Sequence, residues 1–294
     1  MMTERMIHLG LIGYPLGHSF SKILQEEAFR STGIKGNYHL WEVPATPVGD
    51  LALQSRLEDI RTGQITGINV TIPHKERIIP FLDALTPIAS AIGAVNTIFW
   101  DSKEKKLCGH NTDAPAFWED LKKLINSNQV RKQALVLGAG GAARAVTYQL
   151  LANNWTVFIA ARKKTRAKEL AHYFMSSETK LNYFELGNGS QVDLEPFGLI
   201  VNTTSAGMAP MVETSPWPDN WRFPSDAVVY DLVYNPAVPQ FIKQAKRAGL
   251  KTRNGLGMLV EQAALAFECW TAVVAPREEM LKAVTGIYQN LLSE

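Results

Sequence analysis

A lysine follows two polar residues at the end of an apolar segment, TGINVTIPHKERI (66–78). Asn69 and Thr71 are two residues apart, so in a strand their side chains point to the same face. Pro73 is typical of the first turn of a helix, which predicts that Lys75 lies near a helix N-terminus. A cation is unfavourable there, because the helix dipole places partial positive charge at that end. The segment is therefore either an ordinary turn with a solvated lysine or part of a polar site that uses Lys75.

Hydroxyl, amide and carboxyl side chains also follow three other apolar segments. GYPLGHSFSK (13–22) places Ser19 and Ser21 near an expected helix start. A single serine there is usually an N-cap, whereas two could bind a carboxylate. Asn96 interrupts the apolar run AVNTIFW (94–100) and needs a hydrogen-bond partner. GHNTDAPAF (109–117) places Asn111–Asp113 at a strand-to-helix turn, where Asp113 is either a helix cap or an acidic group of a site.

A glycine turn, VLGAGGAARAV (136–146), carries the strongest local motif. Gly138, Gly140 and Ala143 match G-x-G-x-x-G/A directly after an expected strand, Ala134–Leu137, and before a helical pattern. Gly138 permits the tight turn, Gly140 lets a pyrophosphate approach the backbone, and Ala143 allows close packing of helix and strand. The helix N-terminus then provides free N–H groups for the anion. The segment predicts a dinucleotide site; a tight turn without a ligand is the alternative.

A basic cluster follows the next expected strand, WTVFIAAR (155–162). An NAD site would place an acidic residue there for the ribose 2′-hydroxyl. No Asp or Glu lies between Leu151 and Lys168, and the cluster instead contains Arg162, Lys163, Lys164 and Arg166. Cationic side chains pair with a 2′-phosphate that a carboxylate would repel, so the cluster favours NADP over NAD. The alternative is a solvated basic helix start.

Composition narrows the function class. The chain has 294 residues and a formal net charge of +2, which gives no indication of nucleic-acid binding. Cys108 and Cys269 are far apart and without metal-ligand spacing, so we expect reduced thiols, no metal site and a cytoplasmic location. The apolar segment at 257–276 contains Glu261, Gln262 and Glu268, so we expect a buried helix and no membrane span.

Short apolar runs alternate with helical patterns along most of the chain, which predicts an α/β fold with a largely parallel sheet in each of two units. After the strand at 67–72 we expect a helix over 75–85, bent at Pro80. Two helices, about Met258–Val273 and Glu278–Leu292, have no strand after them. We expect them to pack back onto the first unit.

Eight motifs resemble those of the shikimate dehydrogenase family, in their order and rough spacing, from about Ile7 to Phe267. These motifs are GYPLGHSFSK, GINVTIPHKE, GAVNTI, GHNTDAPAF, VLGAGGAARA, NTTSAGM, YDLVYNP and GLGMLVEQAA. The resemblance implies reduction of 3-dehydroshikimate to shikimate with NADPH, in the pathway to aromatic amino acids. It also implies an N-terminal α/β substrate domain, residues 1–112 completed by 255–294. The Rossmann-type, doubly wound NADP-binding domain would be residues 113–254.

Individual residue roles are carried over by the same motifs. The resemblance implies that Ser19 and Ser21 bind the substrate carboxylate, and that Lys75 and Asp113 are the catalytic pair. The other substrate-site residues that it implies are Asn69, Thr71, Asn96, Thr112, Tyr234 and Gln262. The expected cofactor-binding residues, with those of the glycine turn and the basic cluster, are Gly138, Ala139, Gly140, Gly141, Ala142, Arg162, Lys163, Arg166, Thr203, Gly255 and Met258.

Three departures from the family pattern matter for specificity. The usual proline after the second serine is Lys22, the usual glycine after NTD-x-x is absent, and the usual NRT of the 2′-phosphate loop is Ala161–Lys163. A shikimate dehydrogenase that uses NADP is the first hypothesis. The second is a family member that also takes quinate or uses NAD, and the third is a non-catalytic NADP-binding homologue. The sequence predicts a monomer or a homodimer without choosing between them.

Overall fold

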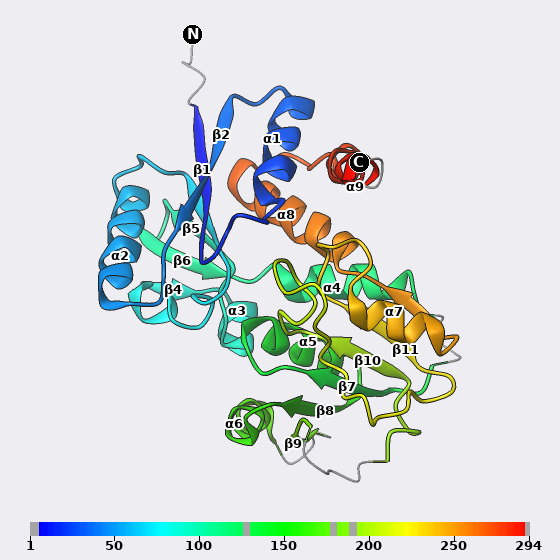
Figure 1. Cartoon of the computed structure of the whole chain (residues 1–294). Coiled ribbons are helices and arrows are strands. Elements are labelled where there is room, and N and C mark those ends of the chain that lie inside the picture. The colour runs from blue at the N-terminus through cyan, green and yellow to red at the C-terminus, as the bar shows by residue number, and fades with distance from the viewer. Residues whose placement is uncertain (1–5, 126–129, 177–180, 188–192, 292–294) are drawn as a thin grey trace. The chain divides into compact units, whose positions relative to one another are not determined.

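The chain divides into two compact units in a computed structural model that describes residues 6–125, 130–176, 181–187 and 193–291 (Figure 1). The first unit comprises Met1–Thr112 and Leu259–Glu294, and the second comprises Asp113–Met258. The chain therefore returns to the first unit after Met258, four residues later than the 254/255 boundary expected from the motifs. The α/β class with two sheets is confirmed.

The first unit is built on a six-stranded sheet with the order β2-β1-β3-β5-β6-β4. Its strands are β1 (Ile7–Gly13), β2 (Gly36–Glu42), β3 (Gly67–Val70), β4 (Ala84–Leu85), β5 (Thr97–Asp101) and β6 (Lys106–His110). β2, β1 and β3 are parallel, whereas β5 runs antiparallel to both β3 and β6. The sheet is thus mixed, because a tight turn at 102–105 joins β5 directly to β6. Asp101 fixes that turn by accepting hydrogen bonds from the N–H groups of Lys103 and Glu104.

Helices cover this sheet through apolar stripes. They are α1 (Ser21–Thr32), α2 (Pro47–Arg61), α3 (Pro87–Ile92), the unit's part of α8 (Leu256–Thr271) and α9 (Arg277–Leu291). In α2 the side chain of Thr46 caps the helix, and Leu53, Leu57 and Ile60 enter a core with strand residues such as Ile68. α9 packs against α1, so the C-terminal helices complete the first unit as expected.

The helix expected over residues 75–85 is absent, and that prediction is wrong. Turns occupy 75–78, a single 3₁₀ turn (η1) spans Ile79–Phe81, and β4 follows. Pro80 explains the break, because it has no N–H to donate within a helix and its ring clashes with the preceding turn. Lys75 is therefore not at a helix N-terminus.

The second unit contains a fully parallel sheet with the order β12-β11-β10-β7-β8-β9. Its strands are β7 (Gln133–Leu137), β8 (Thr156–Ala161), β9 (Leu181–Glu185), β10 (Leu199–Asn202), β11 (Val228–Asp231) and β12 (Lys251–Arg253). Its helices are α4 (Asp113–Lys122), α5 (Gly141–Ala152), α6 (Lys164–Phe174) and α7 (Gln240–Arg247), with the first residues of α8. The strand order reverses between β7 and β10, as in a doubly wound fold. No strand was expected at β9. The helical pattern at 114–127 predicts a longer helix than α4, which ends at Lys122 and is followed by a turn; residues 126 and 127 lie outside those described.

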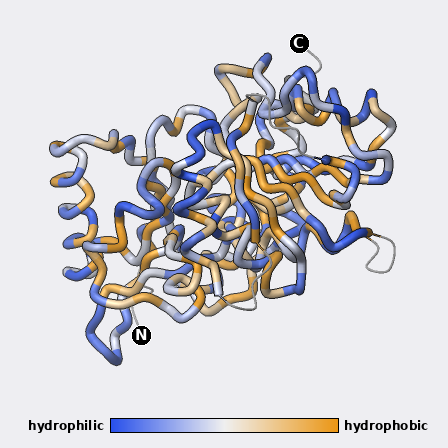
Figure 2. The backbone as a smooth tube through the Cα atoms, turned by 90° about the horizontal axis from the view of Figure 1, so that it is seen from below, coloured by the Kyte–Doolittle hydropathy of each residue, from blue (hydrophilic) through white to orange (hydrophobic). Residues whose placement is uncertain are grey.

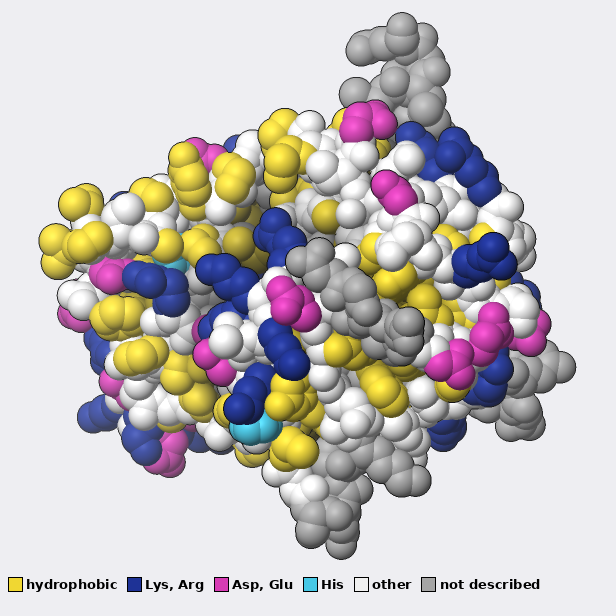
Figure 3. Space-filling model, turned by 60° about the horizontal axis from the view of Figure 1, so that its bottom comes forward, with side chains coloured by type: hydrophobic (Ala, Val, Ile, Leu, Met, Phe, Trp, Pro, Cys, Tyr) yellow, Lys and Arg dark blue, Asp and Glu magenta, His cyan; other side chains and the backbone are white. Residues whose placement is uncertain are grey.

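Apolar and charged side chains are distributed as expected for a chain with a weak net charge. β3, β10 and β11 are buried along their whole length, and hydrophobic stretches recur along the backbone tube (Figure 2), consistent with sheets covered by helices. On the face drawn in Figure 3, Lys and Arg are interspersed with Asp and Glu. None of the helices in the described part of the chain is long and apolar enough to cross a membrane.

Candidate active site

A short, hydrogen-bonded turn holds Lys75 at the carboxyl end of β3. The backbone carbonyl of Lys75 accepts from the N–H of Val95 (2.8 Å), and the N–H of His74 donates to the carbonyl of Thr71 (2.8 Å). The His74 ring is buried, and its Nε2 lies 2.5 Å from the carbonyl oxygen of Val43. Because a carbonyl only accepts, Nε2 carries the proton. His74, which the sequence analysis did not single out, therefore ties the turn of Lys75 to the chain that leaves β2.

Asn69 stands beside this turn as part of a buried amide network. Its Oδ1 accepts from the hydroxyl of Tyr38 (2.8 Å), and its Nδ2 donates to the carbonyl of Asn96 (3.1 Å) and to Thr97 Oγ1 (3.2 Å). All four side chains are buried. Both amide hydrogens are used, so Asn69 acts first as a framework residue. Neither Tyr38, which lies outside the eight motifs, nor Thr97, which lies within GAVNTI, was expected to take part in the site.

Asn96 continues the network to Thr112. The Asn96 Nδ2 donates to Thr112 Oγ1 (2.9 Å), and its Oδ1 accepts from the Thr112 N–H (2.8 Å). The Thr112 hydroxyl lies 3.1 Å from the carbonyl oxygen of Gln262 in α8. The partner that Asn96 was expected to need is therefore Thr112, and the structure brings Asn69, Asn96, Thr112 and Gln262 together in one wall.

Ser19 and Ser21 form a hydroxyl pair at the start of α1. Their Oγ atoms lie 3.2 Å apart, and Ser19 Oγ accepts from the N–H of Ser21 (3.3 Å). The N-cap residue of α1 is Phe20, and no side chain caps this helix. Ser21 is one turn before Gln25, a buried residue whose Nε2 donates to the carbonyl of Ala263 (2.9 Å). The serine pair is therefore fixed to α8, the helix that also carries Gln262.

The remaining predicted residues of this group lie in both units. Thr71 is half-buried just after β3, and the side chain of Gln262 donates to the carbonyl of Leu259 (2.8 Å). Asp113 is buried at the first position of α4, and Tyr234 is half-buried after β11. Asp113 and Tyr234 belong to the second unit and the other predicted substrate-site residues to the first.

The glycine turn of the second unit has the form that an anion site requires. Gly138 has φ = +119°, and a Cβ there would lie 2.5 Å from Thr203 Oγ1, so both conformation and space demand glycine. Gly140 is the exposed N-cap of α5, with no side-chain cap and open space beyond it. Ala139, Gly141 and Ala142 line the same turn. An uncapped helix start under a bare glycine fits the pyrophosphate of a dinucleotide.

The basic cluster begins where β8 ends. Arg162 and Lys163 are exposed, and Lys163 is the N-cap residue of α6 without a side-chain cap bond. Arg166 is also exposed and forms an ion pair with Glu169 (3.1 Å), so part of its charge is offset within the helix. The cluster can thus pair with a 2′-phosphate mainly through Arg162 and Lys163.

The carboxyl ends of β10 and β11 carry a second network that the sequence analysis missed. The Thr203 hydroxyl donates to the carbonyl of Leu137 (2.7 Å), which ties β10 to the glycine turn. Asn202 Nδ2 donates to Asp231 Oδ1 (2.8 Å), which also accepts from the Val233 N–H (3.0 Å). Among the described residues, Asp231 Oδ2 has no hydrogen-bond partner although it is buried. Burial raises the pKa of Asp231 from 3.8 to about 7.

Asp231 should make the stability of the protein depend on pH. Because the folded-state pKa is raised, the stabilising contribution is complete below about pH 4 and is lost as the pH rises towards 7. The difference between the two pKa values, 3.8 and about 7, corresponds to roughly 4 kcal/mol of unfolding free energy. We expect Asp231→Asn to flatten the fall of the unfolding temperature between pH 4 and 7, measured by circular dichroism. Asp226→Asn, an exposed change near β11, is the control; equal slopes in all three proteins would contradict the assignment.

Gly255 and Met258 lie where the chain passes from β12 into α8. The N–H of Gly255 donates to the carbonyl of Val233 (3.2 Å), and a Cβ at Gly255 would lie 2.1 Å from the carbonyl oxygen of Leu232. Met258 is buried. Glycine at 255 is therefore required for the close approach of this segment to the chain after β11.

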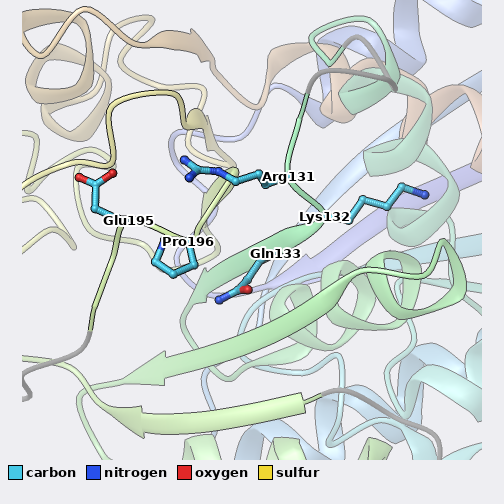
Figure 4. A pocket seen from close by; sticks show the side chains of 5 residues that line it. All are labelled: Arg131, Lys132, Gln133, Glu195 and Pro196. Atoms are coloured by element: carbon cyan, nitrogen blue, oxygen red, sulfur yellow. The ribbon is translucent and has the colours of Figure 1, made fainter.

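A surface pocket of the second unit lies at the other edge of its sheet (Figure 4). It is lined by Arg131, Lys132, Gln133, Glu195 and Pro196. Gln133 begins β7 and Pro196 precedes β10, whereas the glycine turn and Asn202 stand at the carboxyl ends of those strands. Ligands of doubly wound folds bind at the carboxyl ends. The pocket is thus separate from the expected cofactor site.

Comparisons with known proteins match most of the chain to one group of dehydrogenases. Three family models match: the shikimate dehydrogenase substrate binding domain at residues 11–98, shikimate / quinate 5-dehydrogenase at 120–214, and the shikimate 5′-dehydrogenase C-terminal domain at 255–285. The chain is similar to the shikimate dehydrogenase (NADP(+)) of Carboxydothermus hydrogenoformans, with 43% identity over 94% of this chain and 95% of the relative.

Two solved structures share the fold over nearly the whole chain. A shikimate dehydrogenase in complex with NADP+ has a TM-score of 0.85 and 34% identity, covering 98% of each chain. The enzyme from Thermus thermophilus, in complex with NADP(H) and shikimate, has a TM-score of 0.79 and 36% identity, covering 94% of this chain and 98% of the other.

Proposed function

The chain belongs to the shikimate dehydrogenase family, and from this premise we propose that it catalyses the reversible reduction of 3-dehydroshikimate to shikimate with NADPH. It is an NADP-dependent oxidoreductase of the shikimate pathway. The observation that carries the proposal is the placement of Lys75 beside the buried amide wall. The Lys75 carbonyl bonds to Val95, and the next residue, Asn96, is bonded to both Asn69 and Thr112.

The substrate side of the proposal assigns a task to each polar group. The hydroxyls of Ser19 and Ser21 bind the carboxylate of the substrate, which is charged and can accept two hydrogen bonds. The residues that hold the ring hydroxyls or the walls around them are Asn69, Thr71, Asn96, Thr112, Tyr234 and Gln262. Because the internal bonds of Asn69 and Asn96 are already made, their amides enter binding with little reorganisation.

Lys75 and Asp113 are the proposed catalytic residues. Lys75 gives a proton to the substrate oxygen as the carbonyl becomes an alkoxide, or stabilises the negative charge that forms there. The Asp113 carboxylate balances the charge of the lysine. NADPH, when bound, supplies the hydride.

The cofactor side rests on the fit of the glycine turn and the basic cluster. Backbone N–H groups around Gly138, Gly140 and the start of α5 would hold the pyrophosphate, with Ala139, Gly141 and Ala142 as its neighbours. Arg162 and Lys163, supported by Arg166, would hold the 2′-phosphate. Thr203, Gly255 and Met258 would form the wall at the nicotinamide end.

A matrix of steady-state rates tests the proposed function. Shikimate and quinate are each oxidised with NADP+ and with NAD+, and we expect the highest kcat/KM for shikimate with NADP+. Comparable rates with quinate or NAD+ would favour an enzyme of broader specificity. Measurable NADPH binding with no oxidation of NADPH by dehydroshikimate would favour a non-catalytic homologue. Oligomeric state and a cytoplasmic location stay predictions.

The serine pair gives a direct prediction for substrate binding. Hydrogen bonds to a charged group contribute about 1.5–3 kcal/mol each, so Ser19→Ala and Ser21→Ala should each raise the KM for shikimate roughly 10- to 150-fold. The KM for NADP+ should not change. Ser31→Ala is the matched control, because Ser31 is exposed in the last turn of α1 and its described side-chain bond is to the half-buried Glu27. An unchanged KM for shikimate in both variants would remove the serines from the site.

A further inference from the structure

Asp120 is a fully buried carboxylate of the second unit to which the proposed reaction assigns no task. Arg253 binds it with both arms of its guanidinium, Nε to Oδ2 at 2.7 Å and Nη2 to Oδ1 at 2.6 Å. The hydroxyl of Tyr230 donates to Oδ2 (2.8 Å), and the exposed ammonium of Lys123 lies 3.9 Å from Oδ1. One carboxylate in α4 thus connects to β11 through Tyr230 and to β12 through Arg253.

The same face of α4 carries Asp113. Asp113, Phe117 and Asp120 follow the spacing i, i+4, i+7, which places them along one side of a helix, and all three are buried. The rings of Phe117 and Tyr230 meet edge to face at 5.2 Å. The rotation of α4 about its axis, and so the direction of Asp113, is therefore fixed by contacts two turns away.

The start of α8 packs on the same carboxylate. A Cβ at Gly257, the second residue of α8, would lie 2.0 Å from Asp120 Oδ1. Asp120 thus fills the space that the missing side chain leaves. Any residue other than glycine at 257 would push α8 away from α4.

Further bonds fix the segment 253–258 along its length. Asn254 Nδ2 donates to the carbonyl of Ala237 (2.9 Å), and Asn254 Oδ1 accepts from the N–H of Leu256 (3.3 Å). The N–H of Gly255 donates to the carbonyl of Val233. Displacement of Arg253 or Gly257 would therefore move Gly255 and Met258 with them.

Stability alone is a weak reason for this ion pair. Removing two charges from water costs about as much as their attraction returns, and apolar replacements are often neutral or stabilising. An apolar contact would, however, fix the rotation of α4 about its axis and its position along that axis less well than the bidentate ion pair with Arg253 does. We propose that Asp120 is a positioning residue, which holds Asp113 in register with Gly255 and Met258. This inference rests on the proposed roles of those three residues.

Asp120→Asn tests the inference while keeping the shape that Gly257 requires. A displacement of about 1 Å at a reacting group can cost about 10² in rate, so we expect kcat to fall roughly 10- to 100-fold. The KM for shikimate and the ratio of NADP+ to NAD+ use should stay unchanged, since neither the serine pair nor the basic cluster touches Asp120. The primary isotope effect with C4-deuterated NADPH should rise. Glu119→Gln, which removes an exposed ion pair with Lys122 from the same helix, is the control and should match the parent.

A double-mutant cycle separates positioning from loss of fold. Arg253→Met should reproduce the fall in kcat, and Asp120→Asn with Arg253→Met should be no slower than the slower single variant, because both remove one interaction. All rates are measured well below each variant's unfolding temperature. Turnover like that of the parent in both single variants, or losses that multiply, would overturn the positioning role. Activity of the unaltered protein is measured first, so failure of the proposed function is recognised separately.

Discussion

Lys75→Met is expected to lower turnover of shikimate roughly 10²–10⁴-fold, the range found for loss of a group that moves a proton in the transition state. Methionine keeps the length and the apolar stem of lysine but removes its charge and its proton. The surrounding turn should persist, because backbone bonds and the buried His74 ring hold it. The dissociation constant for NADPH, measured by fluorescence, should stay the same.

Two further variants make the result interpretable. Lys106→Met removes an exposed lysine of β6 that pairs with Glu104, and should leave turnover unchanged. Lys75→Arg keeps the positive charge but cannot release a proton at ordinary pH. Substantial turnover in Lys75→Arg would assign charge stabilisation to this position, whereas a loss as large as that of Lys75→Met would assign proton transfer. Near-normal turnover in Lys75→Met would exclude both.

The second large effect is expected at Arg162. A charge-assisted, bidentate contact with a phosphate contributes about 1.5–3 kcal/mol, so Arg162→Gln should reduce the preference for NADP+ over NAD+ roughly 10- to 150-fold. The loss should appear in the KM for NADP+, while kcat/KM with NAD+ stays constant. Lys163→Gln should have a smaller effect, because an exposed ammonium acts as a screened point charge.

Ionic strength and a matched variant test whether the charge of Arg162 causes the change in cofactor preference. Lys168→Gln alters an exposed lysine farther along α6 and should leave the cofactor ratio unchanged. Raising ionic strength should narrow the gap between the parent and Arg162→Gln, because exposed charges are screened over about 8–10 Å at 0.1–0.15 M salt. If Arg162→Gln lowers use of both cofactors equally, Arg162 shapes the loop rather than recognising the 2′-phosphate.

Sequence reasoning succeeded where a local rule decides the structure. The turn between β7 and α5 needs a positive φ at 138, which glycine meets, and Gly140 leaves the start of the helix without a side chain. The alternation of strands with helices is an equally local pattern. These features determine the α/β class and the cofactor turn.

Sequence reasoning failed where a local rule was applied without the residues that follow. Pro73 was taken as a helix start, but Pro80 prevents any helix from continuing, and the segment becomes turns followed by η1. The unusual position of Lys75 therefore cannot rest on a helix dipole. It rests instead on bonds to Val95 and, through His74, to Val43, which no local pattern indicates.

The hydrogen-bond networks around Asn69 and Asp120 could not be predicted, because no local pattern indicates them either. Asn69 bonds to Tyr38 across 31 positions, and Asp120 bonds to Arg253 across 133. Such pairs depend on how strands and helices are placed in three dimensions. A buried aspartate in a helix gives no local sign of its partner, only the requirement that one exist.

The discontinuity of the first unit also orders events during synthesis. Strands β1 to β6 emerge early, but α8 supplies the carbonyls that receive Gln25 and Thr112, and Trp270 donates to Ile98 (3.0 Å). The whole second unit is made before these partners exist. Domains generally fold as units while the chain grows. All residues of the dinucleotide-binding half are therefore made first, whereas Gln25, Thr112 and Ile98 of the substrate-binding half lack these partners until α8 is made.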